Sequence, residues 1–411
     1  MIERLFGWWR DGTPEARRAL VAAWLGWMLD AFDVMLYALV LKSIQDDLGM
    51  STSVAGALGS LTLLASAAGG IVFGLVADRY GRTRALMSSV LIYSVFTAAC
   101  GLAQSVAQLA AFRALLGLGM GGEWASGAAL VSETWPAEHR GKALGFMQSA
   151  WAVGYGAAAA VTGILLPAWG WRGVFFIGIL PAFLTLWVRR RVEEPPIWRA
   201  SRERPAAERG RLADIFGGAM LRLTAAVTIM NAFTMFGWWG FNQWLPTYLR
   251  VPAAAGGIGL SAPTMAAFVV AMQVGMWFGY VTFGFVADAI GRKRAYVIYT
   301  TAAAVLIFLY VSIRVPAALL ALGPFVAFFA TGYFSGFGAV TAEIYPTGIR
   351  ATAQGFTYNI GRIASAAAPW VVGTLAQTRG FPFALSLTSV AFLLAALTWR
   401  WIPETRGRKL A

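Results

Sequence analysis

Two segments of this 411-residue chain repeat one another at a spacing of 210 residues. GLVADRYGRTR begins at Gly74 and GFVADAIGRKR begins at Gly284. The same spacing relates ETWPAEHRGKALGF, from Glu133, to EIYPTGIRATAQGF, from Glu343. Self-similarity on this scale predicts two copies of one large structural unit. We therefore expect a duplicated fold.

Composition indicates that the repeated unit lies in a membrane. The chain is 58% hydrophobic and 13% charged, with a mean hydropathy of +0.64, whereas soluble domains are about 25% charged. Apolar stretches of about 20 residues, enough to cross a bilayer, recur along its length. The twelve predicted spans are 19–42, 53–77, 84–104, 106–131, 141–166, 171–190, 219–248, 262–287, 293–313, 316–341, 350–377 and 381–401. The sequence predicts an all-α membrane protein with two pseudo-symmetric six-helix bundles.

One extended polar stretch divides the chain. Residues 191–218 are rich in Pro and charged side chains, a composition that does not form a membrane span. We expect a cytoplasmic linker there, joining an N-terminal bundle at 1–190 to a C-terminal bundle at 219–411. The linker is suited to short amphipathic helices at the membrane surface.

The net charge of +14 follows from 33 Lys and Arg residues against 19 Asp and Glu residues. With a cytoplasmic amino terminus, most of these cations fall in cytoplasmic segments, as the positive-inside rule requires. The exceptions are Lys42, Arg172, Arg250, Arg314 and Arg379 outside, and Arg113 and Arg362 within helices. The basic excess therefore predicts two cytoplasmic termini and contact with anionic lipid rather than with nucleic acid.

Several classes of site are not expected. A single cysteine, Cys100, excludes an intramolecular disulfide, and a single histidine, His139, has no clustered partners for a metal. The first eighteen residues lack a small-residue cleavage site, so a removable signal peptide is not expected. The G-x-G-x-x-G at 117–122 lies in an apolar helix without a preceding strand, which favours helix packing over dinucleotide binding. We expect no cofactor, no metal and no enzyme activity.

The motifs resemble a known family. The doubled GxxxDRxGR-type loop, the RALLGLGMGGEW segment, the doubled ExxP…R element and the EEPPIW and PETRG tails are similar to those of the major facilitator superfamily. GWMLDAFDVMLYAL in the first span and GGEW in the fourth resemble its metabolite–proton symporter branch, which includes sialate, lactate and aromatic-acid carriers. The resemblance extends over nearly the whole chain.

The repeated loops place opposite charges on one face of the membrane. Gly81 allows a tight turn between Asp78 and the arginines that follow, and such charges pair across neighbouring helices. The family resemblance implies cytoplasmic latches of an outward-open state. These are Asp78, Arg82, Glu133 and Arg140, with their copies Asp288, Arg292, Glu343 and Arg350. The alternative is that the charges only orient the loops.

Ionisable residues within the spans are the strongest functional signal, because they are costly in lipid. Asp30 and Asp33 lie three residues apart on one helix face, and Tyr37 continues that face. Resemblance to sugar porters implies that Asp33 pairs with Arg113. We therefore expect Asp33 to carry a coupling proton, with Arg113 tuning it.

Two further buried charges allow two interpretations each. Glu123 lies about 15 Å along its helix from Arg113 and is either a second protonation site or a protonated packing residue. Arg362 shares a helix face with Asn359 and either anchors a substrate carboxylate or extends towards the cytoplasmic end.

Polar and aromatic residues in other spans are candidates for substrate binding. Besides Arg362, Asn359 and Tyr37, the candidates are Gln148, Asn231, Trp238, Asn242, Gln243 and Gln273. Each of the amide side chains can equally pair between helices, and tryptophans in membranes often serve packing or interfacial anchoring.

The sequence thus predicts a secondary transporter, monomeric in the inner membrane, that binds a small molecule and protons. Symport of protons with a monocarboxylate, aromatic acid or sialate is the leading hypothesis. The alternatives are sugar or polyol symport, export of an amphipathic compound, and a membrane sensor without transport. The embedded charges of the first half have no counterparts 210 residues on. Proton coupling is therefore expected mainly in the N-terminal half and substrate binding more in the C-terminal half.

Overall fold

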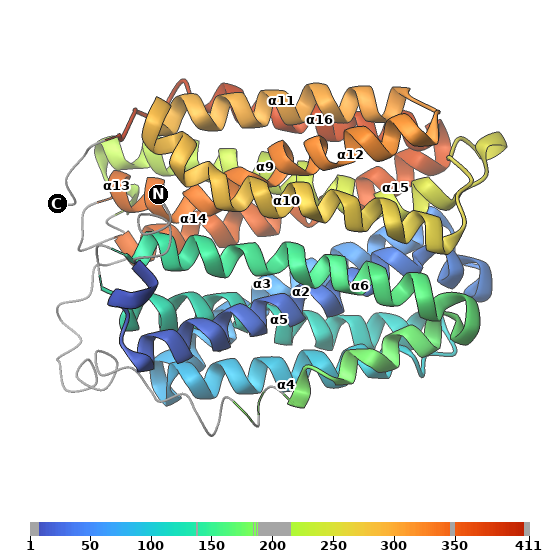
Figure 1. The fold of residues 1–411 in the computed structure, drawn as a ribbon, viewed down its shortest axis with the longest axis horizontal. Coiled ribbons are helices and arrows are strands. Elements are labelled where there is room, and N and C mark those ends of the chain that lie inside the picture. The colour runs from blue at the N-terminus through green and yellow to red at the C-terminus, as the bar shows by residue number, and fades with distance from the viewer. Residues whose placement is uncertain are drawn as a thin grey trace.

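The computed structural model describes residues 8–136, 139–183, 185, 187, 215–345 and 350–406. Over these ranges the chain forms helices and no strands (Figure 1). Nine helices of the described part are long and apolar enough to cross a bilayer. The predicted class of an all-α membrane protein is confirmed.

The first half is built from long helices with well-defined starts. They are α2 (Pro14–Leu48), α3 (Thr52–Tyr80), α4 (Arg82–Cys100), α5 (Val106–Thr134) and α6 (Arg140–Phe176), followed by the short 3-10 helix η1 (Ile177–Ile179). Hydroxyl groups of Thr13, Ser51 and Ser105 accept backbone N–H bonds at the starts of α2, α3 and α5. These caps satisfy N–H groups that a helix leaves unpaired.

The second half repeats this pattern with more interruptions. Its helices are α9 (Gly218–Arg250), η4 (Ala253–Ala255), α10 (Ala262–Ile290), α11 (Arg292–Ser312), α12 (Pro316–Thr331), η5 (Gly332–Gly336), α13 (Phe337–Ile344), α14 (Arg350–Ser365), α15 (Ala367–Arg379) and α16 (Phe381–Thr398). The predicted span 316–341 is broken by η5, and the span 350–377 is broken at Ala366. Pro369, which lacks an N–H, accounts for the second break because it cannot bond to the preceding turn.

The boundary between the predicted fifth and sixth spans differs from the expected loop. Helix α6 runs through the fifth span and into the sixth as far as Phe176, and Gly170 (φ 65°, ψ −177°) forms a kink between the two spans. A positive φ is accessible to glycine at little cost, so one residue replaces a loop. The sixth span is described as far as 183, and residues 191–214 of the predicted linker lie outside the described residues.

Equivalent glycines make the equivalent turns of the two halves. Gly81 (φ 119°) joins α3 to α4, and Gly291 (φ 100°) joins α10 to α11. Each turn consists of this single residue. The tight turn expected at Gly81 is confirmed, and its copy 210 residues later has the same geometry.

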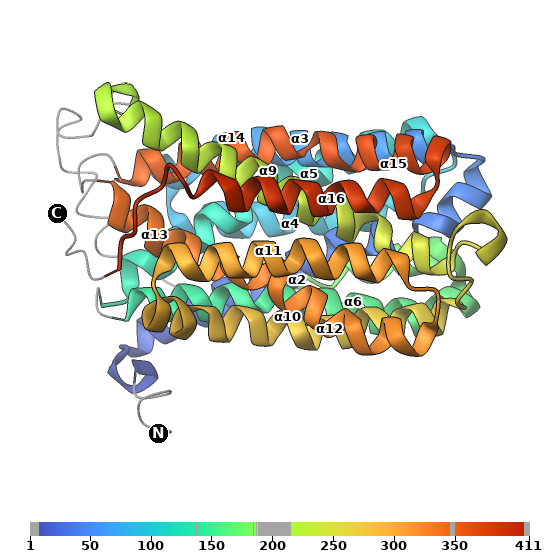
Figure 2. The same ribbon diagram turned by 90° about the horizontal axis from the view of Figure 1, so that it is seen from above.

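Helices α2–α6 and α9–α16 form two groups that lie one beside the other, with their helices running along the long axis of the molecule (Figure 1). In the view from above, helices of the second group lie in front of those of the first (Figure 2). The groups meet where α6 packs on α10, α3 on α15 and α2 on α9. The start of α2 and the end of α16 lie at the same end of the molecule (Figure 1). We call this the terminal end.

At the opposite end, hydrogen bonds join the two halves directly. The hydroxyls of Ser53 and Thr374 are 2.9 Å apart, and the Ser53 N–H donates to Gln377 at 3.1 Å. Here α3 and α15 approach so closely that a Cβ on Gly56 would lie 2.4 Å from the carbonyl oxygen of Pro369. The first turns of α3 therefore rest against the backbone of α15.

Candidate functional site

A cavity of about 30 Å³ lies between the two halves, with room for about two water molecules. Side chains of both halves line it. They are Trp27 of α2, Gln148 and Trp151 of α6, Met235, Trp238 and Trp239 of α9, Tyr280 of α10, Phe334 of η5, and Tyr358 and Arg362 of α14. Binding of a molecule larger than water therefore requires these side chains to move apart.

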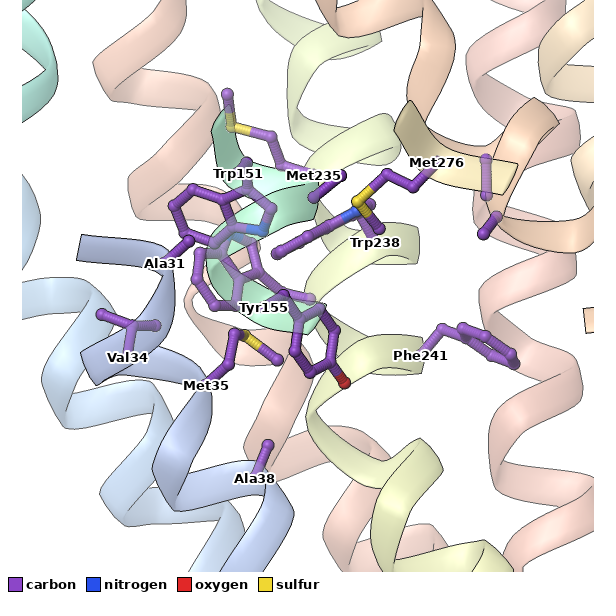
Figure 3. Packing of buried hydrophobic residues seen from close by; sticks show 14 of the residues in the cluster. Ala31, Val34, Met35, Ala38, Trp151, Tyr155, Met235, Trp238, Phe241 and Met276 are labelled. Carbon is purple, nitrogen blue, oxygen red and sulfur yellow. The ribbon is translucent and has the colours of Figure 1, made fainter. Parts of the chain in front are cut away.

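Four tryptophans form a continuous aromatic wall across the boundary between the halves. Ring centroids are 4.7 Å apart for Trp27 and Trp151, 5.5 Å for Trp151 and Trp238, and 4.7 Å for Trp238 and Trp239. Figure 3 shows Trp151 of α6 and Trp238 of α9 facing one another, with Met235 beside them. Such tilted and edge-to-face contacts are favourable for aromatic rings.

Three of these indoles have unused hydrogen-bond donors. The N–H groups of Trp27, Trp151 and Trp238 are buried and have no acceptor among the described residues. Indole can only donate a hydrogen bond, and a buried donor without a partner is costly. The wall is therefore a set of donors as well as an apolar surface.

Arg362 supplies a positive charge to the cavity. Its side chain is 4% exposed, and its Nη1 donates to the Ser66 hydroxyl of α3 at 3.0 Å. The guanidinium carbon lies 5.6 Å from the centre of the Tyr358 ring, one turn earlier on α14. Of the two interpretations of Arg362, the structure agrees with a side chain directed to the cavity between the halves.

Asp30 interacts electrostatically with Arg362 across the boundary between the halves. It is fully buried on α2, one turn beyond Trp27, and also interacts electrostatically with Glu123 of α5. Neither carboxylate has a hydrogen-bond donor among the described residues. Glu123, Asp30 and Arg362 thus form a series of charges that ends at the cavity.

Gly26 makes room for the Glu123 carboxylate. A Cβ at Gly26 would lie 2.5 Å from Glu123 Oε1. The glycine lies one helical turn before Asp30, on the same face of α2. This contact explains how a full carboxylate fits between α2 and α5.

The Asp33–Arg113 ion pair expected from the sugar-porter resemblance is absent from the described part of the structure. Arg113 instead lies over the ring of Tyr37, with its guanidinium carbon 3.7 Å from the ring centre. The Asp33 carboxylate lies beside Gly178 of η1 and Thr97 of α4, since a Cβ on Gly178 would meet Asp33 Oδ1 at 3.1 Å and the methyl of Thr97. A cation–π contact, which is strong when desolvated, replaces the expected pair.

Of the nine residues expected to bind substrate, Arg362, Gln148 and Trp238 line the cavity. The amides of Asn359, Asn242 and Gln273 donate to carbonyls one turn back on their own helices, and Asn231 donates to Thr357 of α14. Gln243 lies at the close approach between Gly59 and Pro369, and the Tyr37 hydroxyl donates to Ala55. Gln273 faces a separate groove of about 380 Å³ between α6 and α10. In this conformation these six lie away from the cavity.

Sequence reasoning missed most of the aromatic lining. Helical spacing was the available signal for two of these residues. Trp27 lies three residues before Asp30, and Tyr358 lies four residues before Arg362, so each shares a face with a buried charge. Trp151, Tyr280 and Phe334 have no such neighbour and become visible only when the helices are packed. Met235 was likewise not expected to line the cavity.

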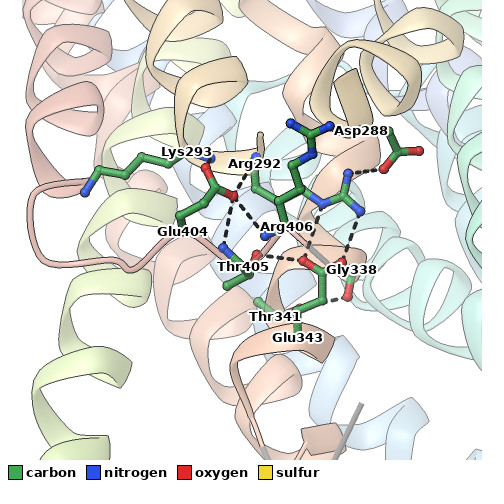
Figure 4. Close-up of polar contacts among 9 residues, drawn as sticks. All are labelled: Asp288, Arg292, Lys293, Gly338, Thr341, Glu343, Glu404, Thr405 and Arg406. Atoms are coloured by element: carbon green, nitrogen blue, oxygen red, sulfur yellow. Dashed lines mark hydrogen bonds and ion pairs between the residues drawn. The ribbon is translucent and has the colours of Figure 1, made fainter. Parts of the chain in front are cut away.

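The repeated charged loops form matching ion pairs at the terminal end. Arg82 Nη2 lies 3.1 Å from Glu133 Oε1, and Arg292 Nη2 lies 3.1 Å from Glu343 Oε1 (Figure 4). Arg292 also pairs with Asp288. The expected pairing is thus present in both halves for these residues. The side chains of Asp78, Arg140 and Arg350 lie outside the described part.

Glu404 extends the cluster of charged side chains around Arg292 in the second half. It accepts hydrogen bonds from the backbone N–H groups of Arg292 and Lys293, at the start of α11, and from those of Thr405 and Arg406 (Figure 4). Partial burial acts to raise the pKa of Glu404, but these N–H groups outweigh it and hold the pKa below its ordinary value. A carboxylate at a helix start is also favoured by the helix dipole.

Comparison with known proteins agrees with this architecture. A family model described as Major Facilitator Superfamily matches residues 23–272 and 251–411. A cis,cis-muconate transport protein of Acinetobacter baylyi is 32% identical over 94% of both chains. A sialic acid transporter of Escherichia coli is 31% identical over 94% of this chain and 93% of its own. The xylose transporter of E. coli, in a partially occluded inward-open conformation, superposes with a TM-score of 0.79 at 21% identity, covering 97% of this chain and 100% of that one.

Proposed function

The chain belongs to the major facilitator superfamily, and from that premise we propose that it is a proton-coupled symporter of small organic anions. The observation that carries the proposal is the buried guanidinium of Arg362, which lines the cavity and interacts with the buried carboxylate of Asp30. The muconate and sialic acid that the two relatives are named for are both carboxylic acids. Family membership makes the chain a multi-pass membrane transporter.

The proposed coupling is a competition between two anions for one cation. When Asp30 is ionised, its charge partly neutralises Arg362, so a substrate carboxylate gains little by binding there. Protonation of Asp30 removes this competitor, and the substrate carboxylate then becomes the partner of Arg362. The proton and the anion bind together because leaving the guanidinium unpaired in a low-dielectric site is costly.

This proposal moves the principal role from Asp33 to Asp30. Asp33 lies near Thr97 and Gly178, away from Arg362, whereas Asp30 lies between Glu123 and Arg362 in the series of charges. Glu123 is then the proton donor and acceptor behind Asp30. In this proposal, the charges of Asp33 and Arg113 contribute to the electrostatic field inside the first bundle.

Alternating access follows from the way the halves meet. The bonds between α3 and α15 close the end opposite the termini, and the Arg82–Glu133 and Arg292–Glu343 pairs brace the terminal end within each half. Rocking of one half against the other opens the cavity to each side in turn. With both termini cytoplasmic in the inner membrane, the bonded end faces outward.

Transport in proteoliposomes tests the coupling directly. Internal pH and the uptake of a panel of labelled carboxylic acids and sugars are recorded under an imposed inward proton gradient, with protein-free vesicles subtracted. We expect the wild-type protein to accumulate carboxylates together with protons. Asp30→Asn should retain exchange of substrate across the membrane but lose accumulation against a gradient, because the variant cannot release the proton.

Two matched variants complete the test. Asp46→Asn changes an exposed aspartate that pairs with Lys42 and should behave as wild type. Asp33→Asn decides between the two aspartates of α2. Accumulation by Asp30→Asn together with its loss in Asp33→Asn would return the coupling role to Asp33, and uptake of sugars alone would overturn anion symport altogether.

A further inference from the structure

The chemistry of the cavity lining restricts the anion more narrowly than charge alone. We propose that the cavity selects a planar, conjugated carboxylate that carries a second hydrogen-bond acceptor, such as a ring nitrogen or a carbonyl oxygen, and that it rejects polyhydroxylated acids. This inference rests on the proposed function and names the substrate class of the same site.

Planarity follows from the shape and composition of the wall. Trp27, Trp151, Trp238 and Trp239 are each less than a tenth exposed and their rings are in contact from one half to the other. The cavity among them is narrow, so a flat molecule requires the smallest separation of the rings. Offset and edge-on contacts with indole also favour another π-system over a saturated ring of equal size.

The second acceptor follows from the balance of hydrogen-bonding groups. Arg362 provides donors for the carboxylate, yet the N–H groups of Trp27, Trp151 and Trp238 remain without a described partner. These groups can only donate, so they favour a substrate whose ring carries hydrogen-bond acceptors. Each satisfied donor is expected to improve binding about fivefold.

The same balance disfavours a polyol. Every sugar hydroxyl needs an acceptor for its proton as well as a donor for its oxygen, and the unused groups of this wall are donors. Burying hydroxyls without acceptors costs free energy. The other polar groups of the lining are the amide of Gln148 and the hydroxyls of Tyr280 and Tyr358, and three such groups are too few for a molecule with many hydroxyls.

Competition for uptake of labelled benzoate in proteoliposomes tests each element of the proposal. Cyclohexanecarboxylate matches benzoate in size without its planarity, nicotinate adds a ring nitrogen, and gluconate is a polyhydroxylated acid. We expect nicotinate to compete about fivefold better than benzoate, as one added hydrogen bond predicts. Cyclohexanecarboxylate should compete about tenfold worse than benzoate, and gluconate should not compete.

Substitution by phenylalanine removes an indole donor and keeps an aromatic ring. Trp27→Phe, Trp151→Phe and Trp238→Phe are compared by the ratio of nicotinate to benzoate affinity, and at least one of them should lower this ratio towards one. Trp399→Phe is the matched control, because its indole N–H is also buried without a described partner but packs on Tyr296 away from the cavity. It should leave the ratio unchanged.

The outcomes separate the selectivity from the transport function. Equal competition by cyclohexanecarboxylate and benzoate, competition by gluconate, or an unchanged ratio in all three cavity variants would overturn the selectivity while leaving proton-coupled anion uptake intact. Absence of carboxylate uptake under a proton gradient would overturn the proposed function itself.

Discussion

At the scale of single residues, the proposed proton coupling depends on how carboxylates are accommodated inside the first bundle. Asp30, Asp33 and Glu123 are all fully buried, and all three act electrostatically on Tyr93. A bilayer-embedded carboxylate without donors is costly, so its position is controlled by the few atoms that leave room for it. Gly26 is one of these, because its missing side chain is the space that Glu123 occupies.

Gly26→Ala is therefore expected to alter proton coupling without unfolding the protein. The new Cβ meets the flexible end of Glu123 at 2.5 Å, so the carboxylate shifts while the backbone stays. We expect the pH at half-maximal accumulation to move by about half a unit or more, since one pKa unit corresponds to about 1.4 kcal/mol. Uptake measured over a pH series reports this shift.

Gly74→Ala is the control, because a Cβ there has open space around it. An unchanged pH profile in Gly26→Ala would show that the position of Glu123 does not influence coupling.

The sequence predicted buried charges well and their partners poorly. Asp30, Asp33, Arg113, Glu123 and Arg362 were all expected within spans, and all are buried. Their partners depend on helix rotation and on the residues of neighbouring helices, which a single sequence does not reveal. The prediction of an Asp33–Arg113 pair was wrong for this reason, because Arg113 packs on the ring of Tyr37 instead.

At the scale of helices, duplication was the most informative signal. It located the turns at Gly81 and Gly291 and the ion pairs of Arg82 and Arg292. It did not predict the interruption at Ala366 or the kink at Gly170. Local breaks of this kind depend on packing and on the identity of one or two residues. They therefore differ between the two halves.

Glu404→Gln should destabilise the α10–α11 end of the second half in a pH-dependent way. The pKa of Glu404 is lowered in the folded protein, so its contribution is present above the pKa of the unfolded chain and disappears as the pH falls through the folded value. Because the side chain is largely exposed, solvent screening limits the effect to roughly 1–2 °C in the unfolding temperature.

The measurement is the temperature at which detergent-solubilised protein loses its monodisperse size-exclusion peak, at neutral pH and near pH 3. Wild type and Glu404→Gln should differ at neutral pH and converge in acid. Asp46→Asn, in an exposed pair, should match wild type throughout, and a difference for Glu404→Gln that persists in acid would contradict the assigned role.

At the scale of the whole molecule, the proposed alternating access requires the two halves to separate at the end opposite the termini. The contacts there are hydroxyl and amide bonds between α3 and α15 together with close backbone approach at Gly56. Each bond of this kind contributes about 1 kcal/mol, so the closed end is suited to repeated opening.

A disulfide across this end should stop transport reversibly. Ser53→Cys and Thr374→Cys replace hydroxyls that are 2.9 Å apart, and a small shift brings the two sulfurs to bonding distance. In a Cys100→Ala background, oxidation is expected to abolish uptake and a reductant to restore it.

The control pair is Ser261→Cys with Thr264→Cys, whose hydroxyls are 2.8 Å apart within the start of α10. Cross-linking inside one half should leave uptake intact. Full activity of the oxidised Ser53–Thr374 pair would mean that these helices do not separate during transport.

The tryptophan wall has an optical consequence. Indoles of both halves lie with ring centroids 4.7–6.1 Å apart, close enough for their electronic transitions to interact. The sign and strength of such an interaction depend on the mutual orientation of the rings. The near-ultraviolet circular dichroism of this protein should therefore change whenever one half rotates against the other, so the chain carries an intrinsic chromophore for following the proposed rocking motion without a label.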